Sequence, residues 1–232
     1  MSERKTETKK LIKVAFTKLL KEKGFNNITV SDITNMAKIN RGTFYLHYID
    51  KFDLLEKLEN DNIEDLKEIL FNKDTHDASN PKELFPYGVI LDALNYAKDN
   101  FEFVSAISCE NGDPSFNDKF KTEMIKLVKL RMKNTYKLKS SDFNISNDYI
   151  YEILTAVPIV IILMWIKKGC VESPKKIANL IMATRNYSPN DFLELVWDLR
   201  NLFSIQTFMK VTNKLHKFNS YQFAHVILYS YL

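Results

Sequence analysis

Residues 28–54, which read ITVSDITNMAKINRGTFYLHYIDKFDL, constrain the fold of this chain more than any other segment. They hold two short helix signals, separated by three or four residues. Each signal begins at a residue type that commonly caps a helix, Thr29 in the first and Asn40 in the second. Asp32 can complete a capping box with Thr29, and an apolar residue before each cap can form a hydrophobic staple. Two such helices joined by a tight turn predict a helix-turn-helix.

The second helix of this motif carries side chains that suit contact with a partner better than packing. Phe44 is expected in the core. The other positions are small, polar or cationic: Arg41, Gly42, Thr43, Tyr45 and His47. We therefore interpret this helix as a recognition helix.

The rest of the chain predicts helices and no sheet. Only 5 Gly and 6 Pro occur among 232 residues, and no segment alternates like a strand between hairpin turns. Pro81 is expected to open one helix and Asn147 to cap another. The chain is therefore predicted to be all-α. Apolar spacing predicts further helices over residues 8–23, 51–71, 81–95, 101–109, 114–136, 148–168, 174–185, 189–203 and 205–217.

The net charge of +4 lies entirely in the part of the chain that contains the motif. Residues 1–60 hold 12 Lys and Arg against 8 Asp and Glu, whereas residues 61–232 hold 21 of each. Positive charge placed there suits phosphate binding. A solvated, lysine-rich surface would give the same count.

Other features of the sequence exclude several classes of protein. Cys109 and Cys170 have no metal-binding spacing and are expected to be small apolar core residues in a reducing compartment. The charged N-terminus is unlike a signal peptide, and the apolar run Ile153–Ile166 is shorter than the roughly 20 residues of a spanning helix. No phosphate loop, nucleophile elbow or metalloprotease motif is present. We expect a cytoplasmic protein that is not an enzyme, with no metal, cofactor or membrane partner.

Across the motif the sequence resembles the TetR family of bacterial transcription regulators. The matching residues are Thr29-Val30, Asp32-Ile33, Ala37, Gly42-Thr43-Phe44-Tyr45, Tyr48 and Lys51. One departure is Lys38, which stands in the turn where the family usually has glycine. A weaker resemblance, to C-terminal domains of the same family, covers residues 100–185. It is carried by Glu110–Phe116, Trp165, Gly169 and Glu172–Ala178.

The resemblance implies two domains. An N-terminal three-helix domain with the helix-turn-helix, residues 1–50, would bind DNA. A larger helical domain, residues 51–185, would bind an effector and dimerise. Residues 186–232 resemble no part of the family, and their apolar spacing predicts C-terminal helices that cover this domain, extend the dimer interface or close the effector cavity.

Resemblance and side-chain chemistry together assign roles in DNA binding. Arg41 and Thr43 are expected at base edges, and Gly42 would let the backbone approach the DNA. Tyr45, His47 and Lys51 are candidates for phosphates. Lys51 also begins the fourth helix, where free backbone N–H groups would favour an anion. Tyr45 packed on the first helix, or His47 in a structural hydrogen bond, would be the alternative.

Two further sets of residues are candidates in the C-terminal domain. A small-molecule effector would be lined by Phe85, Tyr87, Phe101, Phe103, Phe120 and Trp165, each of which could instead be core. An apolar stripe of Ile153, Leu154, Ile161, Ile162 and Trp165 is expected to pack in the core and against a partner subunit.

These expectations combine into a homodimeric, effector-responsive repressor on a double-stranded, pseudo-palindromic DNA operator. Its two recognition helices would enter successive major grooves roughly 34–36 Å apart. One alternative is an activator of the same fold that acts through a protein partner. A nonspecific DNA-coating protein and an enzyme are more remote alternatives.

Overall fold

The computed structural model describes residues 2–71, 84–109, 112–135 and 146–185. Within these ranges all regular structure is helical, which confirms the all-α prediction. The elements are α1 (Ser2–Lys23), the 3-10 turn η1 (Phe25–Asn27), α2 (Val30–Ala37), α3 (Arg41–Tyr45), α4 (Lys51–Phe71), α5 (Tyr87–Asp99), α6 (Phe101–Ser108), α7 (Phe116–Thr135), α8 (Asn147–Lys167) and α9 (Pro174–Ala183).

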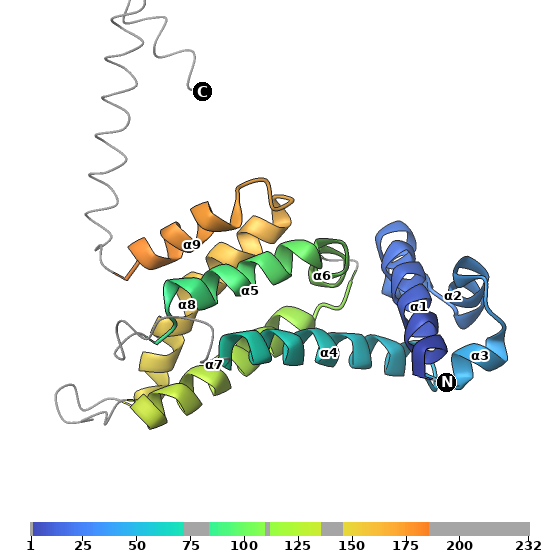
Figure 1. The fold of residues 1–232 in the computed structure, drawn as a ribbon, viewed down its shortest axis with the longest axis horizontal. Coiled ribbons are helices and arrows are strands. Elements are labelled where there is room, and N and C mark those ends of the chain that lie inside the picture. The colour runs from blue at the N-terminus through green and yellow to red at the C-terminus, as the bar shows by residue number, and fades with distance from the viewer. Residues whose placement is uncertain (1, 72–83, 110–111, 136–145, 186–232) are drawn as a thin grey trace, which may run out of the picture. The chain divides into compact units, whose positions relative to one another are not determined.

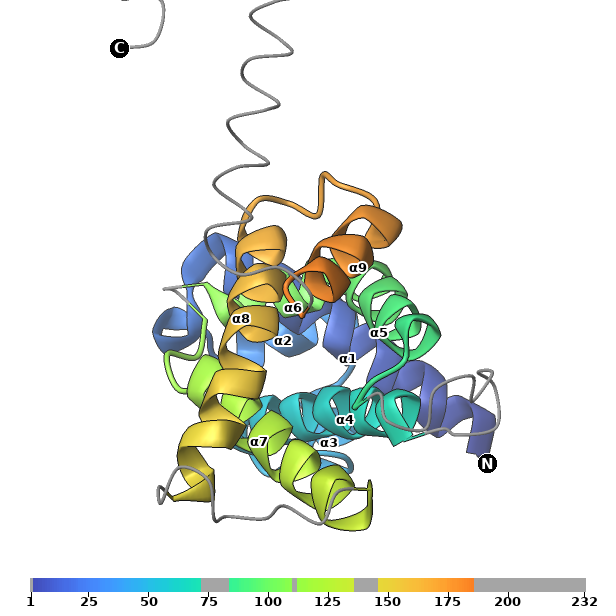
Figure 2. The same ribbon diagram turned by 90° about the vertical axis from the view of Figure 1, so that its left-hand side faces the viewer.

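These helices belong to one unit of the chain, Met1–Ala183, and Thr184–Leu232 forms a second unit. The helices predicted at 189–203 and 205–217 lie outside the described residues. In the first unit α1 packs on α2 and α6, and α4 packs on α5 and α7 (Figure 1). Helix α8 contacts α6, α7 and α9, and α9 also contacts α5 (Figure 2).

Helix α1 buries one face and ends at Gly24. Ile12, Phe16 and Leu20 are fully buried on that face, as the apolar spacing predicted. Leu11 belongs to the same apolar run in the sequence, but 43% of its surface is exposed because it lies about 100° around the helix from Ile12. Gly24 has a φ of 72°, which explains why the helix stops at a glycine.

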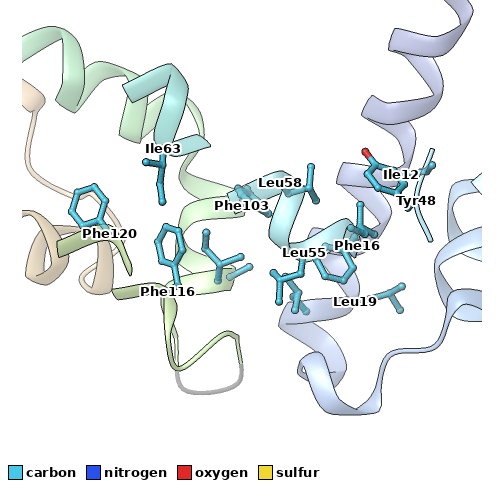
Figure 3. Close-up of a cluster of buried hydrophobic side chains, with 14 of the residues drawn as sticks. Ile12, Phe16, Leu19, Tyr48, Leu55, Leu58, Ile63, Phe103, Phe116 and Phe120 are labelled. Carbon is cyan, nitrogen blue, oxygen red and sulfur yellow. The ribbon is translucent and has the colours of Figure 1, made fainter. Parts of the chain in front are cut away.

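One hydrophobic cluster runs from the N-terminal helices through α4 into α6 and α7 (Figure 3). Phe16 of α1, Leu55 and Leu58 of α4, Phe103 of α6 and Phe116 of α7 are all buried in it. The packing is therefore continuous across residue 50, and the functional boundary expected there stays a prediction. Because α4 shares one core with α1 and with α7, a displacement in the C-terminal helices can reach the N-terminal ones.

A second cluster joins α5, α8 and α9 around Trp165. Trp165 is 2% exposed, and its indole Nε1–H donates to the carbonyl of Glu172 at 3.0 Å. Cys170 is buried in this cluster, as predicted. Cys109 is exposed, so its prediction as a core residue was wrong. It follows the last turn of α6, and its thiol donates to the carbonyl of Ala106 there.

Three details of the predicted helices differ from the structure. Helix α5 begins at Tyr87, after Pro86, and not at Pro81, which lies outside the described residues. Pro86 suits the cap position because it has no N–H group that would need a partner. Ser146, rather than Asn147, caps α8, since its hydroxyl accepts from the N–H of Asp148. Leu130 of α7 was expected to be buried but is 49% exposed.

The turn before α7 requires its glycine. A Cβ atom on Gly112 would lie 2.4 Å from the carbonyl oxygens of both Ala106 and Ile107. These are backbone atoms, which cannot move aside as a flexible side chain can. The close approach of Gly112 to these carbonyls holds α6 and α7 near one another.

By length and composition alone, α8 could cross a membrane. The sequence argument considered only the run Ile153–Ile166, but the helix has 21 residues, so its length does not exclude a span. Only 22% of its most apolar window is buried inside the described residues. Ile159, Trp165 and Ile166 are the apolar residues of this helix that are buried against other helices of the chain.

Candidate nucleic-acid interface

Helix α2 begins with the predicted capping box. The Thr29 hydroxyl accepts from the N–H of Asp32 at 3.2 Å, and the Asp32 carboxylate accepts from the N–H of Thr29 at 2.9 Å. Lys23, at the end of α1, pairs with the same carboxylate at 2.9 Å. Hydrogen bonds from the Thr29 side chain and from Lys23 lower the pKa of Asp32 to about 2. The charge of Asp32 thus holds the start of α2 against the end of α1.

The turn between the two helices contains a left-handed residue that is not glycine. Lys38 is left-handed, with φ 54° and ψ 42°, at the position where the family usually has glycine. A non-glycine residue in this conformation costs roughly 1 kcal/mol. The turn still forms, because the N–H groups of Lys38 and Ile39 bond to carbonyls of α2.

Helix α3 is capped by Asn40 and anchored by two aromatic rings. The Asn40 side chain accepts from the N–H of Gly42 at 2.8 Å, as predicted. Phe44 is fully buried and Tyr48 is 4% exposed, with ring centroids 5.6 Å apart. These rings fix which face of the helix points inward, and therefore which face remains free.

The free face of α3 presents Arg41, Gly42, Tyr45 and Leu46 to solvent. Tyr45 is 56% exposed, so it does not pack on α1 as the structural alternative supposed. The Arg41 guanidinium donates to the Ser31 hydroxyl of α2. Thr43 lies at the edge of this face and is half-buried.

Lys51 and His47 lie beside this face but already have partners. The Lys51 ammonium donates to the carbonyls of Phe25 and Asn26 at 3.0 and 3.1 Å, so one of its three protons is left for a phosphate. The expected free N–H groups at the start of α4 are not free. Asp50 accepts from the N–H groups of Phe52 and Asp53, which caps the helix with a carboxylate.

The arrangement of capped α2, tight turn and exposed α3 matches known regulators. The family described as "Bacterial regulatory proteins, tetR family" matches residues 12–58, and "Transcriptional regulator C-terminal region" matches residues 86–187. Together these cover most of the described helices. The chain belongs to the TetR family.

Two solved structures and one curated relative extend this comparison. DhaS, a dihydroxyacetone kinase operon activator, is 26% identical to this chain. Its TM-score is 0.51, and the match covers 76% of this chain and 95% of DhaS. A TetR-family regulator from Syntrophomonas wolfei has a TM-score of 0.59 at 17% identity, covering 78% and 94% of the two chains. An uncharacterised regulator of Bacillus subtilis, YxbF, is 38% identical over 65 residues. That match spans 28% of this chain and only 17% of the relative.

The predicted effector-lining residues of this TetR-family chain are divided between its two hydrophobic clusters. Phe103 and Phe120 are buried in the first cluster, and Trp165 is buried in the second. Phe85, Tyr87 and Phe101 are half-buried against these clusters. A pocket of about 350 Å³ between α4 and α7 is polar instead. Its lining residues are Asn60, Ile63, Glu64, Lys67, Lys119 and Glu123.

A buried carboxyl group lies between the same two helices. Glu59 of α4 is 3% exposed, and its Oε2 accepts from Lys119 of α7 at 3.1 Å. Among the residues that the structure describes, its Oε1 has no hydrogen-bond partner. Burial raises the pKa of Glu59 to about 7, against the attraction of Lys119 and with a further increase from Asp113.

This raised pKa predicts a pH dependence of folding. The folded state binds the Glu59 proton more tightly than the unfolded state does. Protonated Glu59 therefore stabilises the fold fully below pH 4.5, and this stabilisation is lost as pH rises through about 7. A Glu59→Gln protein should lose this slope and be more stable than the wild type at pH 8. Urea unfolding from pH 4.5 to pH 8 measures the difference. Parallel stability curves for the two proteins would contradict the buried placement of Glu59.

Helix α8 leaves an apolar stripe exposed. Ile153, Val157, Val160 and Met164 recur every three or four residues, and between 48% and 69% of each is exposed. The stripe predicted from the sequence combined residues of this exposed face with residues of the buried face. Ile153 and Leu154 are indeed exposed, whereas Ile161 and Ile162 pack on the second cluster, with Trp165 at its centre.

Proposed function

We propose that this TetR-family protein regulates transcription by binding a pseudo-palindromic DNA operator as a homodimer. The observation that carries the proposal is the exposed face of α3, which Phe44 and Tyr48 hold outward. Arg41 can pair bidentately with guanine in the major groove, and the Thr43 methyl can meet a thymine methyl. Tyr45, His47 and Lys51 are the residues that we propose for the phosphates that flank the groove.

Selection of bound sequences from a random duplex pool tests this proposal, with the purified full chain. We expect a two-fold symmetric preferred sequence with half-sites about one helical turn apart. Recovery of no preferred sequence would leave only nonspecific coating.

On the selected duplex, Arg41→Ala should weaken binding by roughly 1–3 kcal/mol and relax the preference at one base pair. Lys51→Ala should weaken all sequences about equally and reduce the salt dependence by about one ion. Lys18→Ala is a matched control, since Lys18 is exposed on α1 and pairs with Glu22 of the same helix. If Arg41→Ala binds like the wild type in titrations at fixed salt, α3 is not the recognition helix.

The homodimer is supported by the exposed stripe of α8 together with Leu180 of α9, which is 41% exposed. Large contiguous apolar surfaces on soluble proteins usually mark interaction sites. A second copy of this chain is the partner that we propose, because TetR-family regulators function as dimers.

An effector-responsive repressor remains our preferred form of the regulator. A ligand shifts DNA binding only if its affinity differs between two arrangements of the protein. Two routes connect the C-terminal helices to α3. One is the shared core of α4; the other joins α1 to α6, where Lys21 pairs with Glu102 and the Lys13 ammonium lies 4.8 Å from the centroid of the Phe103 ring. The six aromatic lining residues stay a prediction.

An activator is the second candidate, favoured by the name of DhaS, which is an operon activator. Transcription from a promoter that carries the selected sequence distinguishes the two, since deletion of the regulator raises expression for a repressor and lowers it for an activator. A non-enzymatic role follows the family, whose members are transcription regulators.

A further inference from the structure

The exposed face of α3 contains a leucine that the sequence interpretation left without a role. Leu46 follows the last residue of α3 and is 81% exposed. Its backbone remains helical, with φ −72° and ψ −15°, and its N–H donates to the carbonyl of Gly42 at 3.1 Å. Leu46 therefore lies one turn beyond Gly42 on the same side of the helix.

The position of Leu46 excludes a role in folding. Phe44 and Tyr48, two residues away on either side, point into the core, and the same helical phase directs Leu46 outward. Because its side chain stays in water, Leu46 adds no hydrophobic stabilisation to the fold. A polar residue at this position would leave the fold equally stable. Gly42, one turn earlier, has no side chain that could screen Leu46 from an approaching surface.

We propose that Leu46 determines sequence specificity by packing against the 5-methyl group of a thymine in the major groove. This inference rests on the proposed DNA binding by α3. The thymine methyl is the apolar group that base edges present in this groove, so it is the natural partner for an exposed leucine on a recognition helix. Each half-site of the operator then contains a thymine that Arg41 and Thr43 do not account for.

Deoxyuridine, which lacks only this methyl group, provides the test. In the duplex selected by the full chain, each thymine is replaced in turn by deoxyuridine, and binding is titrated at fixed salt. For the wild type, replacement of the thymine that meets Leu46 should weaken binding by about fourfold, the value of one buried methyl group, and replacement of a thymine that meets the Thr43 methyl should weaken it too. Leu46→Ala should bind thymine and deoxyuridine duplexes equally at the first of these positions and keep the wild-type ratio at the second. Leu130→Ala, at a half-exposed leucine of α7, should keep the wild-type ratio.

The outcomes separate the inference from the function on which it rests. A chain that selects no sequence overturns both. A chain that selects a sequence but binds every deoxyuridine duplex as tightly as the thymine duplex overturns the thymine contacts of both Leu46 and Thr43, but not sequence-specific binding. A Leu46→Ala protein that keeps the wild-type thymine-to-deoxyuridine ratio at every position overturns the role of Leu46 alone.

Discussion

A Val160→Asp protein should fold as a monomer and bind the operator at least about 100-fold more weakly than the wild type. Val160 lies in the middle of the exposed stripe of α8, where 56% of its surface is accessible. In the monomer the new carboxylate would remain in water, so folding should be little affected. In a dimer the same carboxylate would be buried without a partner, which is costly.

The loss of DNA affinity follows from the loss of the second recognition helix. Linking two binding modules raises overall affinity by about 10²–10⁴-fold, because the second contact becomes intramolecular. A monomer has only one half-site contact and loses this gain. Sedimentation measures the mass, circular dichroism the helix content, and a titration the affinity.

Leu130→Asp is the matched control for this prediction. Leu130 is 49% exposed on α7, outside the stripe, and should keep the wild-type mass and operator affinity. Ile161→Asp is a less informative variant. Ile161 packs on the second core cluster, so a charge there would disrupt the fold as well. A Val160→Asp protein that sediments as a dimer would remove α8 from the interface.

The helix-turn-helix could be predicted because its determinants are local in sequence. Thr29, Asp32 and Asn40 act on backbone groups two or three residues away, so the sequence contains both partners of each hydrogen bond. The left-handed turn at Lys38 could be located for the same reason. The alternation of buried Phe44 and Tyr48 with exposed Tyr45 also follows from helical phase alone.

The features that were missed depend on contacts between distant parts of the chain. Lys51 is held by carbonyls of η1, which lies 25 residues earlier, and no local pattern announces this. In α8, apolar residues surround the helix, so spacing could not tell the core face from the exposed one. The exposure of Leu46 could have been predicted from the sequence. Helical periodicity places it on the face opposite Phe44 and Tyr48, where a leucine is unexpected if the helix only packs against the core.

Gly42→Ala should leave the fold intact, or slightly more stable, while DNA binding falls by about 10–100-fold. The fold does not need a glycine here. A Cβ atom at residue 42 would lie 3.5 Å from the Asn40 side chain, an ordinary contact. Alanine is also the better helix former, by roughly 1 kcal/mol in a helix interior.

The cost of this substitution should therefore appear only in the complex. Interface cores pack as tightly as protein interiors, and one extra methyl group in such packing costs roughly 1–3 kcal/mol. If α3 enters the groove with Gly42 against the DNA, the new methyl group would hold the helix away and weaken the neighbouring contacts of Arg41 and Leu46. Thermal unfolding and operator titration on the same preparation separate the two effects. A Gly42→Ala protein with wild-type affinity would mean that another surface of α3 faces the DNA, whereas lowered stability would mean that the glycine serves the fold after all.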